Sequence, residues 1–232
     1  MKTKLIYLII FVVGCFFVSG NAWATSYDFG DAIGYGVATH SNPSWQRLGT
    51  VWDSEASQKL VDTSDDGVSW SVDGGSTYGQ DDILAGQTVS FKFDMYKELW
   101  GNHTYDHLKV WLDWDRDGFD SGDEIFLGSW NFTLETDYVK GDGFAGISKT
   151  FDLMDLIIPD DALGDYWLRA RVACNFDITN FPDSFSPYGQ VWQGEVEDWM
   201  LTVNPVPEPS TFLLLGGGLA GLAFYARRRK NG

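Results

Sequence analysis

The chain has 232 residues, with 33 acidic and 16 basic side chains and a formal net charge of −17. Nucleic-acid binding needs basic patches, so this charge excludes nucleic acid as a partner and favours cations, neutral glycans or other proteins. Hydrophobic residues make up 44% of the chain and aromatic residues 16%, which excludes a disordered acidic tail. The sequence therefore predicts a folded domain with its own core.

The first 24 residues have the pattern of a secretory signal peptide. Lys2 and Lys4 precede an apolar stretch at residues 5–18, and a small residue, Trp23 and a second small residue close the segment. We expect cleavage before Thr25 and therefore an exported protein.

The C-terminal segment, residues 205–232, combines three parts. A short motif comes first and consists of Pro207, Glu208, Pro209 and Ser210. An uncharged apolar stretch at residues 211–226 and a basic cluster at residues 227–230 follow it. Because a basic cluster after an apolar span holds a tail in the cytoplasm, we expect a transmembrane helix that anchors the chain until it is processed.

This tail resembles the PEP-CTERM sorting signal of Gram-negative bacteria, through its Pro-Glu-Pro motif, its single helix and its arginine cluster. The resemblance implies that a membrane-embedded exosortase recognises and removes the tail. It also implies transient anchoring in the inner membrane and then release to the cell surface or the extracellular polysaccharide matrix. The chain would be the substrate of that reaction.

Removal of both ends leaves a strongly acidic domain at residues 25–204. This domain keeps 10 basic and 32 acidic residues, a net charge near −22. Cys15 leaves with the signal peptide and Cys174 remains as the single cysteine, so no disulfide within the chain is expected. We expect its stability to come from a hydrophobic core and from a metal ion.

The middle of the chain predicts an all-β domain. Apolar residues recur with period two in seven short runs bounded by Gly, Asp, Asn and Pro: residues 68–72, 88–93, 107–113, 124–130, 147–153, 166–172 and 195–203. This spacing favours a single β-sandwich of about 7–9 short strands.

One acidic segment, residues 113–124, satisfies the calcium-loop pattern D-x-D-x-D-G-x5-E. The oxygen donors assigned by that pattern are Asp113, Asp115, Asp117, the carbonyl of Phe119 and Glu124. The flanking residues have the pattern of strands instead of the helices of an EF-hand. We therefore expect a Ca²⁺ loop between two strands, with an acidic, solvated hairpin turn as the alternative.

Residues 194–199, Gly-Glu-Val-Glu-Asp-Trp, begin the last predicted strand. Glu195 and Glu197 share one face of that strand, as Arg169 and Arg171 do on theirs. This alternation predicts a ladder of Arg–Glu pairs between neighbouring strands. The alternative is a glycosidase pair, which needs about 5 to 10 Å between its two carboxyl groups.

The same residues resemble the bacterial GEVED domain, from which the sequence departs in having Trp199 where Tyr is usual. Further stretches follow the order of that family: residues 27–32, 48–49, 66–68, 111–113, 158–159 and 169–171. The resemblance implies an exported β-sandwich module, common in surface and adhesin-like proteins, without an established catalytic activity.

These observations favour a non-catalytic surface or matrix module, stabilised by calcium. A carbohydrate-binding protein is the alternative, because residues 176–192 carry Phe, Tyr and Trp side chains that would stack on sugars or cover the sandwich. A glycoside hydrolase is less favoured. The expected partners are an exosortase and, outside the cell, polysaccharide or other surface proteins.

Overall fold

The structure is a computed structural model, and it describes residues 27–42, 45–52, 54–59, 65–98, 105–131, 138–141, 144–174, 185–207 and 211–230. The predicted signal peptide lies outside the described residues, as do residues 208–210 of the sorting motif.

All seven predicted strands are present. They are β4 (Val68–Ser71), β6 (Thr88–Glu98), β7 (Tyr105–Leu112), β8 (Glu124–Asn131), β10 (Phe144–Ile157), β11 (Gly164–Cys174) and β13 (Glu195–Asn204). Six further strands of two to five residues bring the described residues to thirteen strands: β1 (Asp28–Phe29), β2 (Ala38–Asn42), β3 (Gln46–Leu48), β5 (Ile83–Leu84), β9 (Tyr138–Gly141) and β12 (Gly189–Gln193). The two- and three-residue strands are too short to show a period-two pattern, and β2 (Ala-Thr-His-Ser-Asn) lacks alternating apolar residues.

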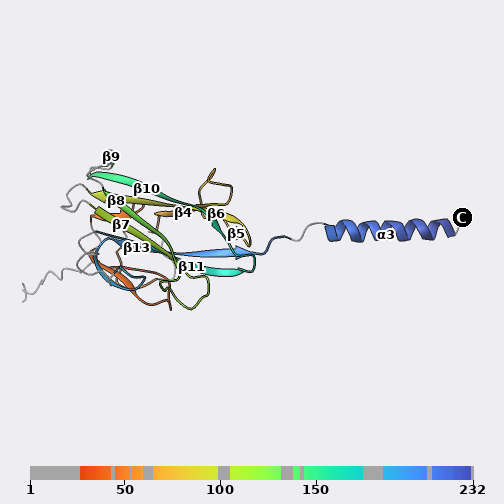
Figure 1. The fold of residues 1–232 in the computed structure, drawn as a ribbon, viewed down its shortest axis with the longest axis horizontal. Coiled ribbons are helices and arrows are strands. Elements are labelled where there is room, and N and C mark those ends of the chain that lie inside the picture. The colour runs from red at the N-terminus through yellow and green to blue at the C-terminus, as the bar shows by residue number, and fades with distance from the viewer. Residues whose placement is uncertain are drawn as a thin grey trace, which may run out of the picture.

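Two five-stranded sheets form the β-sandwich (Figure 1). The first has the order β5-β13-β11-β7-β8, and the second has the order β3-β6-β10-β9 with β4 also paired to β6. Successive side chains of a strand point to opposite faces of the sheet. The apolar residues of the period-two pattern point inward, so the inner face of each sheet is apolar. The main core between the sheets includes Phe91, Phe93, Leu108, Val110 and Leu168, each fully buried.

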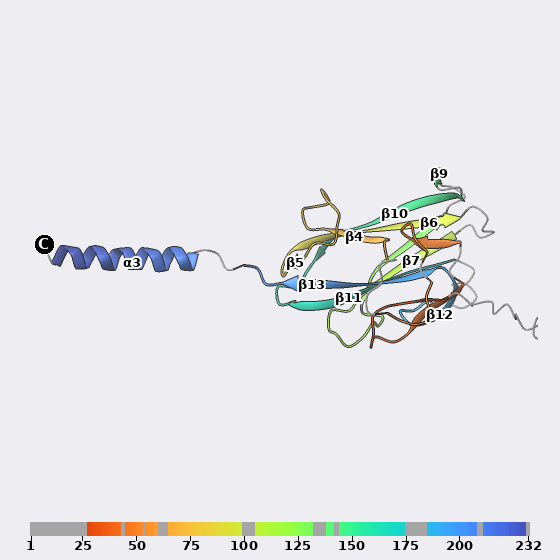
Figure 2. The same cartoon turned by 180° about the vertical axis from the view of Figure 1, so that it is seen from behind.

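A third, smaller sheet with the order β1-β2-β12 makes a layer that the sequence did not predict. In Figure 2 the β12 region lies beside β11 and β13, away from β6 and β10. Two small apolar clusters join this layer to the outer face of the first sheet: Ala32, Trp111 and Phe119 in one, and Ala173, Phe185 and Val191 in the other. The first sheet is therefore covered on both faces over part of its area.

The C-terminal helix α3 (Thr211–Lys230) coincides with the predicted sorting helix and stands apart from the sheets in Figure 1. Among the helices of the described residues, none combines the length and the apolar character that a bilayer span requires. Cys174, at the end of β11, is buried.

Candidate metal centre and signature strand

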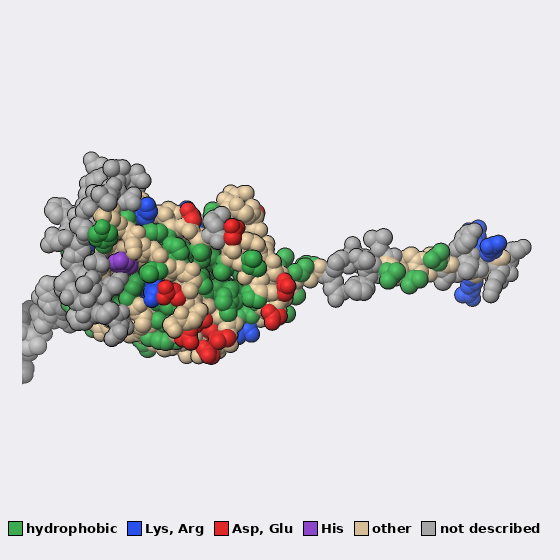
Figure 3. All heavy atoms as spheres, in the orientation of Figure 1, with side chains coloured by type: hydrophobic (Ala, Val, Ile, Leu, Met, Phe, Trp, Pro, Cys, Tyr) green, Lys and Arg blue, Asp and Glu red, His purple; other side chains and the backbone are tan. Residues whose placement is uncertain are grey.

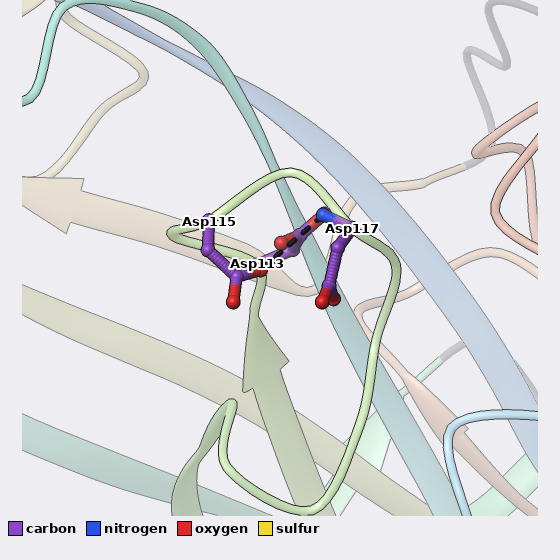
Figure 4. A group of neighbouring side chains, drawn as sticks. All are labelled: Asp113, Asp115 and Asp117. Carbon is purple, nitrogen blue, oxygen red and sulfur yellow. Dashed lines mark hydrogen bonds between the residues drawn. The ribbon is translucent and has the colours of Figure 1, made fainter.

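The acidic loop connects β7 to β8 and brings three carboxylates together. Asp113 directly follows β7 and is fully buried, while Asp115 and Asp117 are exposed. One carboxylate oxygen from each of the three lies within 4.8 Å of the others (Figure 4). The first three donors assigned by the loop pattern are therefore neighbours in space.

The backbone of the loop wraps around the Asp113 carboxylate. Its Oδ1 accepts a hydrogen bond from the Arg116 N–H at 2.7 Å, and its Oδ2 accepts one from the Gly118 N–H at 3.3 Å. Asp115 Oδ1 accepts from the Asp117 N–H at 3.2 Å. Gly118 has a φ of 111°, a left-handed conformation that glycine adopts without steric cost. This explains the need for glycine at the sixth position of the loop.

The carboxylates of the loop repel one another. The negative charge of Asp115 raises the pKa of Asp117, and the charges of Asp120 and Asp113 add to the effect. Acidic side chains also gather along the lower edge of the domain in Figure 3. Such a concentration of negative charge favours binding of a cation, and carboxylate oxygens are the ligands that Ca²⁺ prefers.

The two remaining predicted donors have different surroundings. The Phe119 side chain is 1% exposed and packs in the cluster with Trp111 and Ala32, which fixes the backbone at the position whose carbonyl the pattern assigns to the ion. Glu124 lies outside the group of three mutually close carboxylates and forms a salt bridge with Lys109. The structure therefore does not bring Glu124 to the other donors.

Asp123 is a further acidic side chain of this segment that the pattern did not assign, and like Glu124 it lies outside the group of three mutually close carboxylates. Its side chain is largely buried, and its Oδ2 accepts the Asp120 N–H at 2.8 Å. Burial raises the pKa of Asp123, and the charges of Asp113, Asp120 and Asp115 act in the same direction. The negative charges of the loop therefore act on the Asp123 carboxyl group. Asp123 lies one position before Glu124, the donor that the pattern assigns.

The predicted Arg–Glu ladder is wrong, although its two strands are neighbours. In the antiparallel pairing of β11 with β13, Arg169 faces Asp198 and Arg171 faces Val196. Glu197 faces Ala170, on the opposite side of the sheet. The arginines therefore point toward the third layer, and the glutamates point into the sandwich.

Arg169 forms a fully buried bidentate ion pair with Asp198. Its Nε and Nη2 donate to the two carboxylate oxygens at 2.7 and 2.6 Å. Its guanidinium also lies 4.8 Å from the centre of the Phe119 ring. The ion pair is thus joined by packing to the acidic loop.

Arg171 binds backbone carbonyls instead of carboxylates. Its guanidinium donates to the carbonyls of Ser186, Tyr188, Thr39 and Gly189. Its Nε lies 3.4 Å from Nε2 of His40. Burial and the charge of Arg171 hold the pKa of His40 well below its usual range, so the ring is neutral and accepts from the arginine. Arg171 therefore fastens β2 and the start of β12 to the first sheet.

The two glutamates of residues 194–199, the signature segment at the start of β13, hold strand β3 and the residues before β4 at the edge of the second sheet. Glu195 Oε2 accepts the Leu48 N–H at 2.7 Å, and Glu197 accepts from the N–H groups of Asp66 and Gly67. Both side chains are 1% exposed. Because they face the interior and bind backbone amides, they are not placed to act on a glycosidic bond, and the glycosidase alternative loses its carboxyl pair.

The aromatic segment is described from residue 185 onward. Phe185 is buried and meets Trp111 edge to face at 6.3 Å, while Tyr188 is half-buried beside the acidic loop. Trp192 is 59% exposed. The segment thus covers the outer face of the first sheet and leaves some of its aromatic surface accessible.

The fold and site define a β-sandwich module with an acidic loop and a separate C-terminal helix. Residues 107–202 match the GEVED domain, and residues 205–230 match the PEP-CTERM protein-sorting motif. The chain therefore carries a GEVED-type domain followed by a PEP-CTERM sorting motif, as the resemblances implied. Its tail marks it for export, transient membrane anchoring and processing by an exosortase, and then for the surface. A comparison with curated proteins found no match.

Proposed function

We propose that the domain is a non-catalytic, calcium-stabilised module of the cell surface or extracellular matrix of a Gram-negative bacterium. The observation that carries this proposal is the group of three carboxylates, Asp113, Asp115 and Asp117, with oxygens within 4.8 Å of one another. Asp113 is buried and directly follows the core strand β7, so an ion bound there would act directly on the sandwich.

A bound cation would increase the free energy of unfolding of this acidic domain. The domain is near −22 and has one cysteine, so neither charge balance nor a disulfide stabilises it. An ion that binds only the folded state adds RT ln(1 + [L]/Kd), about 2.7 kcal/mol when free calcium is a hundredfold above Kd. The ion would also cancel the repulsion in the loop and fix the register of β7 against β8.

Thermal unfolding of the exported protein in millimolar calcium and in EDTA tests this proposal. For a domain of this size, about 2.7 kcal/mol corresponds to a rise in melting temperature of about 5 to 10 °C. Asp117→Ala should lower the melting temperature in calcium and have little effect in EDTA. Asp161→Ala, an exposed acid outside the loop, is the matched control. Equal melting temperatures of the wild type in calcium and in EDTA would contradict the proposal.

The proposal that the domain is non-catalytic rests on the two glutamates of strand β13. Glu195 and Glu197 are buried and bonded to backbone amides. Strand β13 therefore uses these two acids for structure, which suits a module that presents a surface to other molecules of the matrix.

A further inference from the structure

A pocket of about 310 Å³ lies beside the acidic loop. Its walls are residues 34–37, between β1 and β2, together with Asp117, Gly118 and Tyr188. Ligand pockets of proteins begin at about 300 Å³, which is enough for one or two sugar rings. Asp117 is also a proposed calcium donor, so the pocket and the ion site share a wall.

The aromatic side chains of the pocket pack against neighbouring residues. The Tyr188 ring lies against the backbone of Gly36, where a Cβ atom would come within 2.7 Å of it. Its hydroxyl lies above Gly118, 3.0 Å from the position of a Cβ atom there. The Tyr35 ring packs against Phe119 at 5.4 Å and against Trp167 at 6.2 Å. Both tyrosines are half-buried, so part of each side chain stays accessible.

The chemistry of these walls selects the class of ligand. Aromatic faces pack against the C–H faces of a pyranose ring, while phenol hydroxyls and a carboxylate bind its hydroxyl groups. The net charge of the domain, near −22, disfavours an anionic ligand. A neutral saccharide satisfies the apolar rings, the hydrogen-bonding groups and the charge together.

We propose that this pocket binds a neutral saccharide, with Tyr188 and Tyr35 as the packing surfaces. The Asp117 carboxylate binds the hydroxyl groups of the sugar, directly or through the calcium ion that it would hold. The contribution of the ion rests on the proposed function, whereas the contribution of the tyrosines does not.

Calorimetric titration of the full exported protein with neutral gluco-, galacto- and manno-configured tetrasaccharides tests the proposal. At least one of them should bind saturably. Tyr188→Ala should weaken that binding about tenfold, since an aromatic contact is worth about 1 kcal/mol or more beyond its buried area. Val37→Arg, at a 52% exposed side chain of the pocket wall, should block the pocket without entering the core. Trp192→Ala is the control, an exposed aromatic residue outside the pocket wall, and should change the affinity less than about twofold.

The outcomes distinguish saccharide binding in the pocket from calcium binding by the acidic loop. Failure of all three tetrasaccharides to bind would overturn the saccharide proposal, even where calcium still raises the melting temperature. Binding that is unchanged in both Tyr188→Ala and Val37→Arg would also overturn it. Binding that depends on Tyr188 but is equal in calcium and EDTA would support the pocket and remove the role of the ion in it.

Discussion

Arg169 on β11 and Asp198 on β13 face each other directly in the register of the first sheet and share two hydrogen bonds. Both side chains are completely buried. Asp198 Oδ2 also accepts the Ala32 N–H at 2.8 Å, which ties the third layer to the sheet. Asp198 thus joins two layers of the fold, together with Arg171.

Replacement of Asp198 by Asn should destabilise the domain strongly. The change leaves the Arg169 charge buried without its counter-ion, a situation that costs about 3 to 5 kcal/mol. Lys92→Met is the control, because it removes a partly exposed pair with Asp94, worth less than about 1 kcal/mol. Urea unfolding measures both losses. Similar losses in the two variants would show that the buried ion pair contributes no more to the free energy of unfolding than the partly exposed pair.

Glu197 should make the stability depend on pH. Burial raises the pKa of Glu197 to about 7, although the N–H groups of Gly67, Asp66 and Trp199 oppose the shift. The folded state therefore binds the proton more tightly than the unfolded state, whose glutamate pKa is near 4.5. This contribution is present at low pH and is lost as pH rises from about 4.5 to about 7.

Glu197→Gln removes that titration and retains an oxygen that accepts the backbone N–H bonds. Relative to the wild type, the variant should gain about 1 to 3 kcal/mol in free energy of unfolding between pH 5 and pH 8. Urea unfolding at the two pH values, with EDTA present, measures the gain. Glu98→Gln, at the end of β6, is the control. A stability difference between Glu197→Gln and wild type that is the same at both pH values would exclude a raised pKa at this position.

The long strands were predictable from the sequence, and the pairing of their side chains was not. Period two fixes which residues of one strand share a face, so the alternation of Glu195 and Glu197 was clear from the sequence. Which face meets Arg169 depends on the register between the strands, and a shift of one residue exchanges the two faces. The register places Arg169 opposite Asp198, so the arginine binds the aspartate and not the glutamates.

The acidic loop was predictable to a similar degree. The spacing of Asp113, Asp115 and Asp117 within one turn is local, so the sequence indicated that they meet. The last donor depends on how the chain enters β8, where Glu124 has already joined the strand and pairs with Lys109. The spacing of residues within the loop does not predict where β8 begins. The sequence pattern therefore assigned Glu124 and did not consider Asp123.

Asp123 and Glu124 offer a direct comparison for the last donor of the ion. Asp123→Asn should weaken calcium binding about tenfold, a loss of about 1.4 kcal/mol. Glu124→Gln should change it less than about twofold, because that side chain is held by Lys109. Calorimetric titration of the two variants measures the difference. The reverse order would mean that Glu124 leaves Lys109 to complete the loop as the sequence pattern predicted.

The sorting tail should be absent from the finished protein. The PEP-CTERM motif at residues 205–230 marks it for removal by an exosortase. Mass spectrometry of protein recovered from the cell surface should therefore find a chain that ends before helix α3. Recovery of surface protein that ends at Gly232 would contradict processing.

Calcium titration of the exported protein by calorimetry tests the central claim most directly. The wild type should release or absorb heat with a stoichiometry of about one ion per chain, because one group of three carboxylates meets in the described residues. Asp113→Asn should abolish that heat while Asp161→Asn leaves it unchanged, since Asp161 lies outside the loop. A wild-type titration without heat, together with equal melting temperatures in calcium and EDTA, would show that residues 113–124 form only an acidic turn.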